Sequence, residues 1–166
     1  GSDVDYTKWK LTMNDNLDFK LDGRFNYHIE AGGFINANKV FVPDYTHYLG
    51  NQTALASLYL NSFQLMPYYL YSNTNNFYTT AHAEYHLNGL LTNKIPGFKK
   101  LNWFFVLGGN ALYINNGTHY YEAMFSVENI LKVIRIDFVK SFTSNGQSQN
   151  GIRFSIPFAG RGGRRN

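Results

Sequence analysis

The 166-residue sequence contains no cysteine, so it offers neither a disulfide framework nor a thiolate for metal binding or nucleophilic catalysis. Charged residues are also scarce, at 16% of the chain against the roughly 25% that is usual in soluble domains. No run of about 18 apolar residues is present, which excludes a transmembrane helix. These absences leave open a membrane protein that crosses the bilayer with strands, whose alternation keeps the mean hydropathy low.

Aromatic residues are abundant, with 13 Tyr and 14 Phe, and many lie where apolar and polar residues alternate. The segment FYTTAHAEYHLNGLL, residues 77–91, shows the pattern: Phe77, Tyr85 and Leu87 share one parity, and His82 belongs to the other. Successive side chains of a strand point to opposite faces. The pattern therefore predicts a strand with one apolar and one polar face.

Similar segments recur along the chain, and turn-forming residues separate them. We predict eight strands, at about residues 6–20, 24–35, 61–71, 77–91, 102–114, 119–128, 133–142 and 151–158. Pro67 is awkward in the third segment, because proline donates no hydrogen bond to a ladder. Several segments exceed the 5–6 residues usual in soluble strands and reach the 9–11 that cross a bilayer. The predicted fold class is all-β, an antiparallel transmembrane β-barrel with eight strands per chain.

In a membrane barrel the apolar parity faces lipid and the polar parity lines the interior. The residues expected to face lipid are Phe25, Tyr27, Ile29, Phe77, Tyr85, Leu87, Tyr121, Phe125, Ile136, Phe138, Phe154 and Phe158. The residues expected to form a polar interior network are His28, Glu30, His82, Glu84, His86, Glu122, Arg135, Asp137 and Arg153. A soluble ligand-binding barrel is the alternative, and it would need the aromatic parity on the inside.

The cluster of His82, Glu84 and His86 raises the question of a metal site. On one strand the two histidines would lie about 13 Å apart, too far to share an ion. A site would need His28 or Glu30 from the preceding strand, so a hydrogen-bonded interior lining is the favoured interpretation. We predict no metal, no cofactor and no catalytic residue. No nucleophile motif, phosphate loop or convincing acid–base pair points to an enzyme.

The end of the chain carries a family resemblance. VIRIDFVKSF at residues 133–142 and GIRFSIPF at residues 151–158 resemble the last two strands of the bacterial surface antigen superfamily, the outer-membrane assembly and secretion barrels. Upstream, YHIEAGGFINANKVFVPDYTHYLGNQT, SFQLMPYYLYS and HLNGLLTNKIPGFKKLNW are more closely similar to the C-terminal barrel portion of a family of large, uncharacterised outer-membrane proteins related to that superfamily.

The resemblance implies a barrel in the bacterial outer membrane, surrounded by outer-membrane lipid and inserted by the outer-membrane assembly machinery. Phe158 resembles the terminal aromatic signal that this machinery recognises. Family members normally have sixteen strands, so eight strands would make half a barrel. We expect the chain either to close alone or to form a sixteen-stranded homodimer through its first and last strands.

The implied function is a non-catalytic membrane scaffold or pore related to protein assembly and transport, with a small structural or adhesive barrel as the alternative. Arg135 and Asp137 share one face, and Arg153 could reach them from the next strand. An ion-pair network that fixes strand register is the favoured interpretation. The resemblance offers another, in which these residues anchor an inserted loop.

Three regions are expected: a tag or disordered terminus at residues 1–5, the barrel domain at residues 6–158 and a basic flexible tail at residues 159–166. The net charge of +4 and the tail could indicate nucleic acid. Other basic residues are dispersed, so we predict no nucleic-acid partner. If the last strand ends in the periplasm, as the resemblance implies, the connection at residues 36–60 is periplasmic, although periplasmic turns are usually short.

Overall fold

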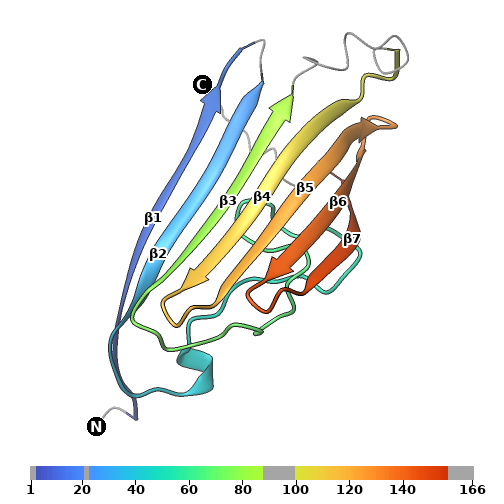
Figure 1. Ribbon diagram of the computed structural model, residues 1–166. Coiled ribbons are helices and arrows are strands. Elements are labelled where there is room, and N and C mark those ends of the chain that lie inside the picture. The colour runs from blue at the N-terminus through green and yellow to red at the C-terminus, as the bar shows by residue number, and fades with distance from the viewer. Residues whose placement is uncertain (1–2, 21–22, 88–99, 157–166) are drawn as a thin grey trace.

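The computed structural model describes residues 3–20, 23–87 and 100–156. These residues form one antiparallel sheet whose strands follow one another in chain order (Figure 1). The strands are β1 (Asp5–Asp18), β2 (Arg24–Lys39), β3 (Tyr78–Leu87), β4 (Phe104–Ile114), β5 (His119–Ile130), β6 (Ile134–Thr143) and β7 (Ser148–Ser155). The prediction of an all-β antiparallel fold is confirmed. Within the described residues, no helix is both long and apolar enough to span a membrane.

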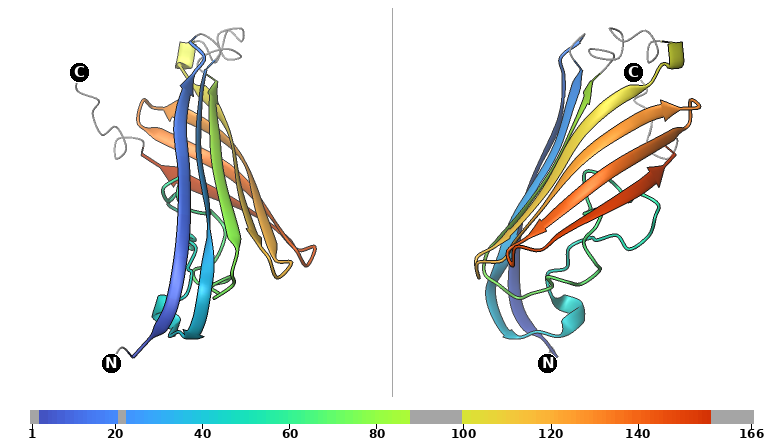
Figure 2. Two further views of the ribbon diagram at one scale, coloured as in Figure 1. Left: turned by 90° about the vertical axis from the view of Figure 1, so that its left-hand side faces the viewer. Right: turned by 45° about the vertical axis from the view of Figure 1, so that its right-hand side comes forward.

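The sheet twists strongly and is open. β7 crosses the direction of β1 at a wide angle, and one face of the sheet is concave (Figure 2). Its two outermost strands are β1 and β7, and within the described residues each pairs with one neighbouring strand. The predicted closure of the barrel is therefore not seen within this part of the chain.

The predicted strand at residues 61–71 is wrong, and the described residues form seven strands instead of eight. β2 pairs directly with β3, from Gly32 opposite Tyr78 to Arg24 opposite His86, so the intervening chain has no place in the ladder. Residues 40–77, here called the insert, are irregular apart from the short 3₁₀ helix η1 (Val42–Asp44). Pro67 lacks a ladder donor, and Tyr69 has a φ of 63°, which a strand does not use.

Losing one strand changes which connections share an end of the sheet. The insert lies at the same end as the turns at residues 115–118 and 144–147 (Figure 1). The turn at residues 131–133 lies at the opposite end. The expectation that the connection at residues 36–60 lies on the side where the last strand ends is therefore wrong, because β7 ends at the opposite end of the sheet.

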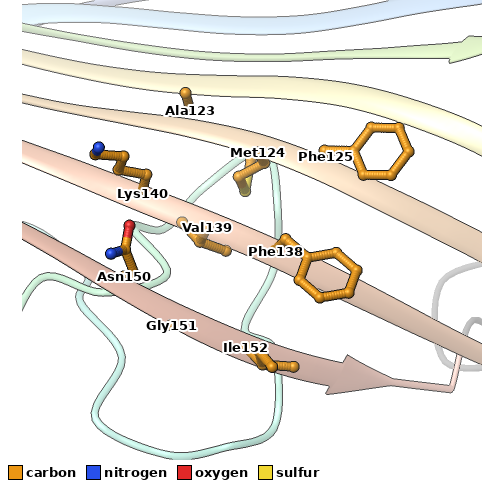
Figure 3. A pocket seen from close by; sticks show the side chains of 9 residues that line it. All are labelled: Ala123, Met124, Phe125, Phe138, Val139, Lys140, Asn150, Gly151 and Ile152. Carbon is orange, nitrogen blue, oxygen red and sulfur yellow. The ribbon is translucent and has the colours of Figure 1, made fainter.

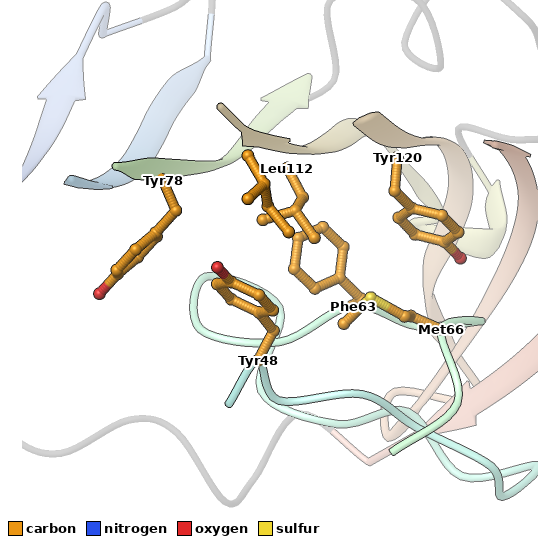
Figure 4. Packing of buried hydrophobic residues seen from close by; sticks show 7 residues of the cluster. Tyr48, Phe63, Met66, Tyr78, Leu112 and Tyr120 are labelled. Atoms are coloured by element: carbon orange, nitrogen blue, oxygen red, sulfur yellow. The ribbon is translucent and has the colours of Figure 1, made fainter. Parts of the chain in front are cut away.

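The insert packs against the concave face through its own apolar side chains. Tyr48, Phe63 and Met66 of the insert form a buried cluster with Tyr78, Leu112, Ile114 and Tyr120 of the sheet (Figure 4). A second cluster joins Leu65 of the insert to Met124 and Val139. The insert thus forms a second layer on the concave face.

The pairing register assigns the two parities to the two faces. On the concave face, His28, His82, Asn110, Glu122 and Ser141 occupy one row across β2 to β6. On the convex face, the neighbouring row runs Ile29, Ala81, Ala111, Tyr121 and Phe142. The polar parity therefore faces the insert, and the apolar parity faces away from it.

Candidate functional site

Charged and polar side chains are buried where the insert covers β3 to β6. They occupy concave positions that the register brings side by side, and they are Glu84, Asn110, Glu122, Ser126, Arg135 and Asp137. Buried charges are tolerated only when partners compensate them. The contacts of these groups therefore decide what the site can do.

Arg135 lies between two buried carboxylates. Its Nη2 is 2.6 Å from Glu84 Oε1 and 3.1 Å from Ser126 Oγ, and its Nε is 2.7 Å from Asp137 Oδ1. The ring of Tyr59, from the insert, stacks on the guanidinium, with 3.8 Å between the guanidinium carbon and the ring centroid. One arginine thus joins three strands and the insert.

The Tyr59 hydroxyl makes two further contacts with the sheet. It donates to Asp137 Oδ2 at 2.6 Å and lies 2.7 Å from Ser155 Oγ. Burial raises the pKa of Tyr59 above its ordinary value, Arg135 opposes the shift, and Asp137 adds to it. The phenol therefore stays protonated and continues to donate to Asp137 at neutral pH.

Glu122 binds the backbone of the insert. Oε2 accepts the N–H of Gln64 and Oε1 accepts the N–H of Leu65, each at 2.7 Å. Asn110 Nδ2 and the Tyr120 hydroxyl donate to the same carboxylate at 2.7 and 2.9 Å. Hydrogen bonds to an ionised acceptor are about twice as strong as neutral ones. Glu122 is therefore the principal polar anchor of the insert.

The Asn110 contact also fixes the proton of His82. Because Asn110 donates through Nδ2 to Glu122, its Oδ1 is free to accept from His82 Nδ1, 2.9 Å away. His82 then carries its proton on Nδ1 when it is neutral. Phe63 of the insert covers the imidazole, with 4.9 Å between the two ring centroids. A chain of hydrogen bonds thus runs from the histidine to the insert anchor.

The nine residues expected in one interior network all lie on the concave face, in separate groups. Glu30 pairs with Lys10 at 2.5 Å beside a cavity of about 320 Å³ that His28 and His82 also line. His86 lies between Glu84 and Glu128, at 3.6 and 3.3 Å. No group of three or more potential ligands in the described part of the chain could hold a metal ion.

Arg153 departs from its predicted partners. Its Nε donates to the carbonyl of Gln64 at 2.7 Å, and among the described residues its side chain makes no hydrogen bond or ion pair with Asp137. The arginine thus holds the insert instead of the ion-pair group. Sequence analysis does not identify Tyr59 and Gln64 as site residues. Tyr59 lies in the predicted connection at residues 36–60, and Gln64 lies in the predicted strand at residues 61–71.

Most residues expected to meet lipid lie on the convex face. Six of them are exposed, namely Ile29, Phe77, Tyr121, Phe125, Phe138 and Phe154, and Phe25, Tyr27, Tyr85 and Ile136 are partly buried. Phe125 and Phe138, for example, are 42% and 49% exposed. Leu87 departs from the expectation at 7% exposed: it is the last residue of β3, where it pairs with Phe105. Phe158 lies outside the described residues.

Aromatic side chains form two rows across the convex face. Where the insert ends and β3 begins, the ring of Phe77 lies 6.2 Å from that of Trp9 and 6.5 Å from that of Tyr113. At the other end of β3, the ring of Tyr85 lies 6.4 Å from Phe19 and 6.5 Å from Phe25. From Phe77 to Tyr85 the chain extends about 26 Å along the strand.

A hollow of about 840 Å³ opens on the face formed by β5, β6 and β7 (Figure 3). Phe125, Phe138 and Ile152 line it at one side, and Lys140 and Asn150 line it at the other. Lys140 Nζ also lies 5.4 Å from the ring centroid of Phe142. This cation is close to the turn at residues 144–147, where a long side chain can reach the aqueous boundary of an apolar surface.

A family model described as "Family of unknown function (DUF5686) C-terminal domain" matches residues 1–127. No curated protein and no solved structure matches the sequence.

Proposed function

Since the chain belongs to the DUF5686 C-terminal domain family, described as of unknown function, we propose its role from its geometry: the sheet is part of the wall of a membrane-spanning β-barrel. Its convex face meets lipid and its concave face lines the interior. The insert then fills part of that interior. No catalysis is proposed, and the role is that of a membrane scaffold, plugged at rest, for protein assembly or transport.

The observation that carries the proposal is the inverted distribution of side chains. Asp137 and Arg135 are 0% and 3% exposed, whereas Phe138 and Phe125 are 49% and 42% exposed on the opposite face. Monomeric soluble proteins rarely expose continuous apolar patches of more than a few hundred Å². A lipid environment would cover the apolar face and leave the polar face to the interior. A soluble ligand-binding barrel would need the opposite arrangement.

Dimensions and aromatic placement support the same proposal. Six of the seven strands have 10 to 16 residues, and β7 has 8 within the described part. About 9–11 tilted residues cross the hydrocarbon core. The two aromatic rows are separated along β3 by about 26 Å, or roughly 20 Å along the membrane normal for a strand tilted by about 40°, which is close to the height of an apolar band about 25 Å tall between two aromatic girdles.

We place the barrel in the bacterial outer membrane, with its lipid and assembly machinery as partners. The support is the resemblance of the last strands to the surface antigen superfamily. With seven strands and a final strand that ends in the periplasm, the insert and the turns at residues 115–118 and 144–147 become external. This places the long insert on the side where outer-membrane barrels carry their longer loops.

The space that the insert occupies limits how the barrel can be closed. An open edge is unfavourable in hydrocarbon, because each unpaired backbone group costs several kcal/mol. The interior of an eight-stranded barrel is just wide enough for side chains. The insert forms a whole layer on the concave face, so seven strands closed alone leave no room for it. We therefore favour a wider barrel that further strands complete, whether from the same protein or from a second copy in a homodimer, over a small closed structural or adhesive barrel.

Liposome flotation tests the membrane role. The proposal expects the refolded chain to need detergent for solubility and to float with vesicles after washing with carbonate. A chain that stays monodisperse in buffer and remains in the aqueous fraction would contradict it. Conductance across a planar bilayer then tests whether the insert blocks the barrel. We expect no ion conductance from the wild-type chain and measurable conductance from a variant in which the Glu122 anchor of the insert is weakened.

A further inference from the structure

The convex face of β3 to β7 carries one charged side chain, that of Lys140 on β6. The register places Lys140 opposite Ala123 of β5 on one side and opposite Asn150 of β7 on the other. At the other convex positions of these strands, the described part of the chain has no Asp, Glu, Lys or Arg. The face proposed to meet lipid therefore carries, on these strands, one cation and no anion.

The ammonium group of Lys140 has no anionic partner among the described residues. It makes no ion pair or hydrogen bond with them, and its one close contact there is the ring of Phe142, whose centroid lies 5.4 Å from Nζ. A basic side chain on a lipid-facing strand is destabilising in the middle of the bilayer and tolerated near an interface. Lys140 lies three residues before the end of β6 at Thr143, or about 10 Å along the strand, so its long side chain can reach the headgroups.

The hollow of about 840 Å³ lies directly beside this cation (Figure 3). Its volume is within the roughly 300–1,000 Å³ that is typical of ligand sites. Lys140 and Asn150 line the side nearer the turn at residues 144–147, and apolar side chains line the side nearer the middle of the strands. These apolar residues are Phe125, Phe138 and Ile152. The hollow is thus polar at the depth of the interface and apolar further into the proposed membrane.

The polar side of the hollow offers hydrogen-bond donors for an anion. The Lys140 ammonium has three N–H donors, and the amide of Asn150, which makes no side-chain hydrogen bond with the described residues, has two more. Phosphate oxygens accept charge-assisted hydrogen bonds from such groups. A phospholipid has the matching order of chemistry along the membrane normal, with its phosphate at the interface and its acyl chains below.

We propose that the hollow binds one anionic phospholipid of the leaflet at the insert end of the sheet. Lys140 and Asn150 hold its phosphate, and an acyl chain lies against Phe125 and Phe138. The inference rests on the proposed membrane role and adds selectivity for one lipid class. Elsewhere on the convex face of β3 to β7, where the described residues present no charge, a lipid is held by apolar contacts alone. The hollow, in contrast, distinguishes an anionic headgroup from a zwitterionic one.

Quenching by brominated lipid measures this selectivity at the hollow itself. Phe125→Trp, combined with Trp9→Phe and Trp103→Phe, places the only tryptophan in the wall of the hollow. The protein is refolded into phosphatidylcholine vesicles that contain, at the same small mole fraction, either phosphatidylglycerol or phosphatidylcholine brominated on the acyl chains. We expect phosphatidylglycerol to be enriched beside the tryptophan about fivefold, the factor for one basic residue at an anionic lipid surface, and therefore to quench more strongly.

Two lysine variants of this reporter protein complete the test. Lys140→Gln should abolish the difference between the two lipids. Lys132→Gln is the matched control, because it removes the same charge from the turn at the opposite end of the sheet and should preserve the difference.

The outcomes separate the binding site from the membrane role. Equal quenching by the two lipids, or a preference for phosphatidylglycerol that survives Lys140→Gln, would overturn the site and leave the membrane role intact. An absence of quenching even in vesicles made wholly of brominated phosphatidylcholine would overturn the membrane role, and the site with it.

Discussion

Glu122 on β5 accepts the backbone N–H of Leu65 at 2.7 Å, and so connects the sheet to an irregular segment 57 residues earlier in the chain. The neighbouring N–H of Gln64 bonds to the other oxygen of the same carboxylate. Two successive amides thus converge on one buried charge. The insert is held mainly by a group that its own sequence does not contain.

Glu122→Gln should loosen the insert. In the variant, one carboxylate oxygen is replaced by an NH₂ group, which faces a backbone N–H of the insert and cannot accept its hydrogen bond. The remaining oxygen is no longer charged, so its hydrogen bond is weaker. We expect binding of the insert to the sheet to weaken by about 2–3 kcal/mol. Limited proteolysis within residues 40–77 measures the change. Glu128→Gln is the matched control, because Glu128 lies on the same strand and contacts His86 instead of the insert. Equal protease resistance in both variants would contradict the anchor.

Arg135→Met should be far more damaging than removal of an exposed arginine. It leaves Glu84 and Asp137 buried without their common partner, and breaking a buried ion pair costs about 3–5 kcal/mol. Adding Glu84→Gln and Asp137→Asn should recover much of the loss. Arg24→Met is the control, since its pair with Asp18 is exposed and contributes at most about 1 kcal/mol. Urea unfolding in detergent compares the variants.

Gly151→Ala should separate the insert from β7. The new methyl group would overlap the Leu65 side chain, and overpacking of this kind costs about 1–3 kcal/mol. Leu65→Ala in the same chain should relieve the overlap, so a double-mutant cycle on unfolding free energies is expected to show strong coupling. If the two substitutions change the free energy of unfolding additively, the Leu65 side chain does not contact position 151. Gly109→Ala is the control, because its nearest neighbour is a carbonyl at 3.4 Å.

The main features of the sheet could be predicted from alternation, because a period of two fixes which side chains share a face whatever the tertiary contacts are. On this basis the sequence predicts that His82 and Tyr85 lie on opposite faces, and the register places them so. Residues 61–71 misled the same reasoning. They alternate like a strand, but Phe63 and Leu65 alternate because they pack on the sheet from above.

The site could be predicted only in part. Polar residues at strand positions were recognised as belonging to one face, since their parity is visible in the sequence. The partners of these residues in the insert could not be predicted, because they are far away in the sequence. Tyr59 is 78 residues from Asp137, and Gln64 is 58 residues from Glu122. Pro67 is the local signal against a strand in this segment, because proline donates no hydrogen bond to a ladder.

Phe138→Arg should impair membrane insertion. A cation at the middle of a lipid-facing strand costs about 2–4 kcal/mol, whereas an exposed substitution in a soluble protein usually changes stability by less than about 0.5 kcal/mol. Gln147→Arg, in the neighbouring turn, is the control. Folding yield into vesicles, read from the heat-dependent gel shift typical of barrels, compares the two. Equal yields would argue that water, and not lipid, meets this face.

Quenching of Trp9 by lipid tests the central claim most directly. Trp103→Phe leaves Trp9, on the convex face beside Phe77, as the only tryptophan. In vesicles of lipids brominated on the acyl chain, we predict strong quenching of Trp9, and little quenching of a tryptophan moved to the opposite face by Thr12→Trp with Trp9→Phe. Quenching of Trp9 by aqueous iodide, with none by brominated lipid, would contradict the account.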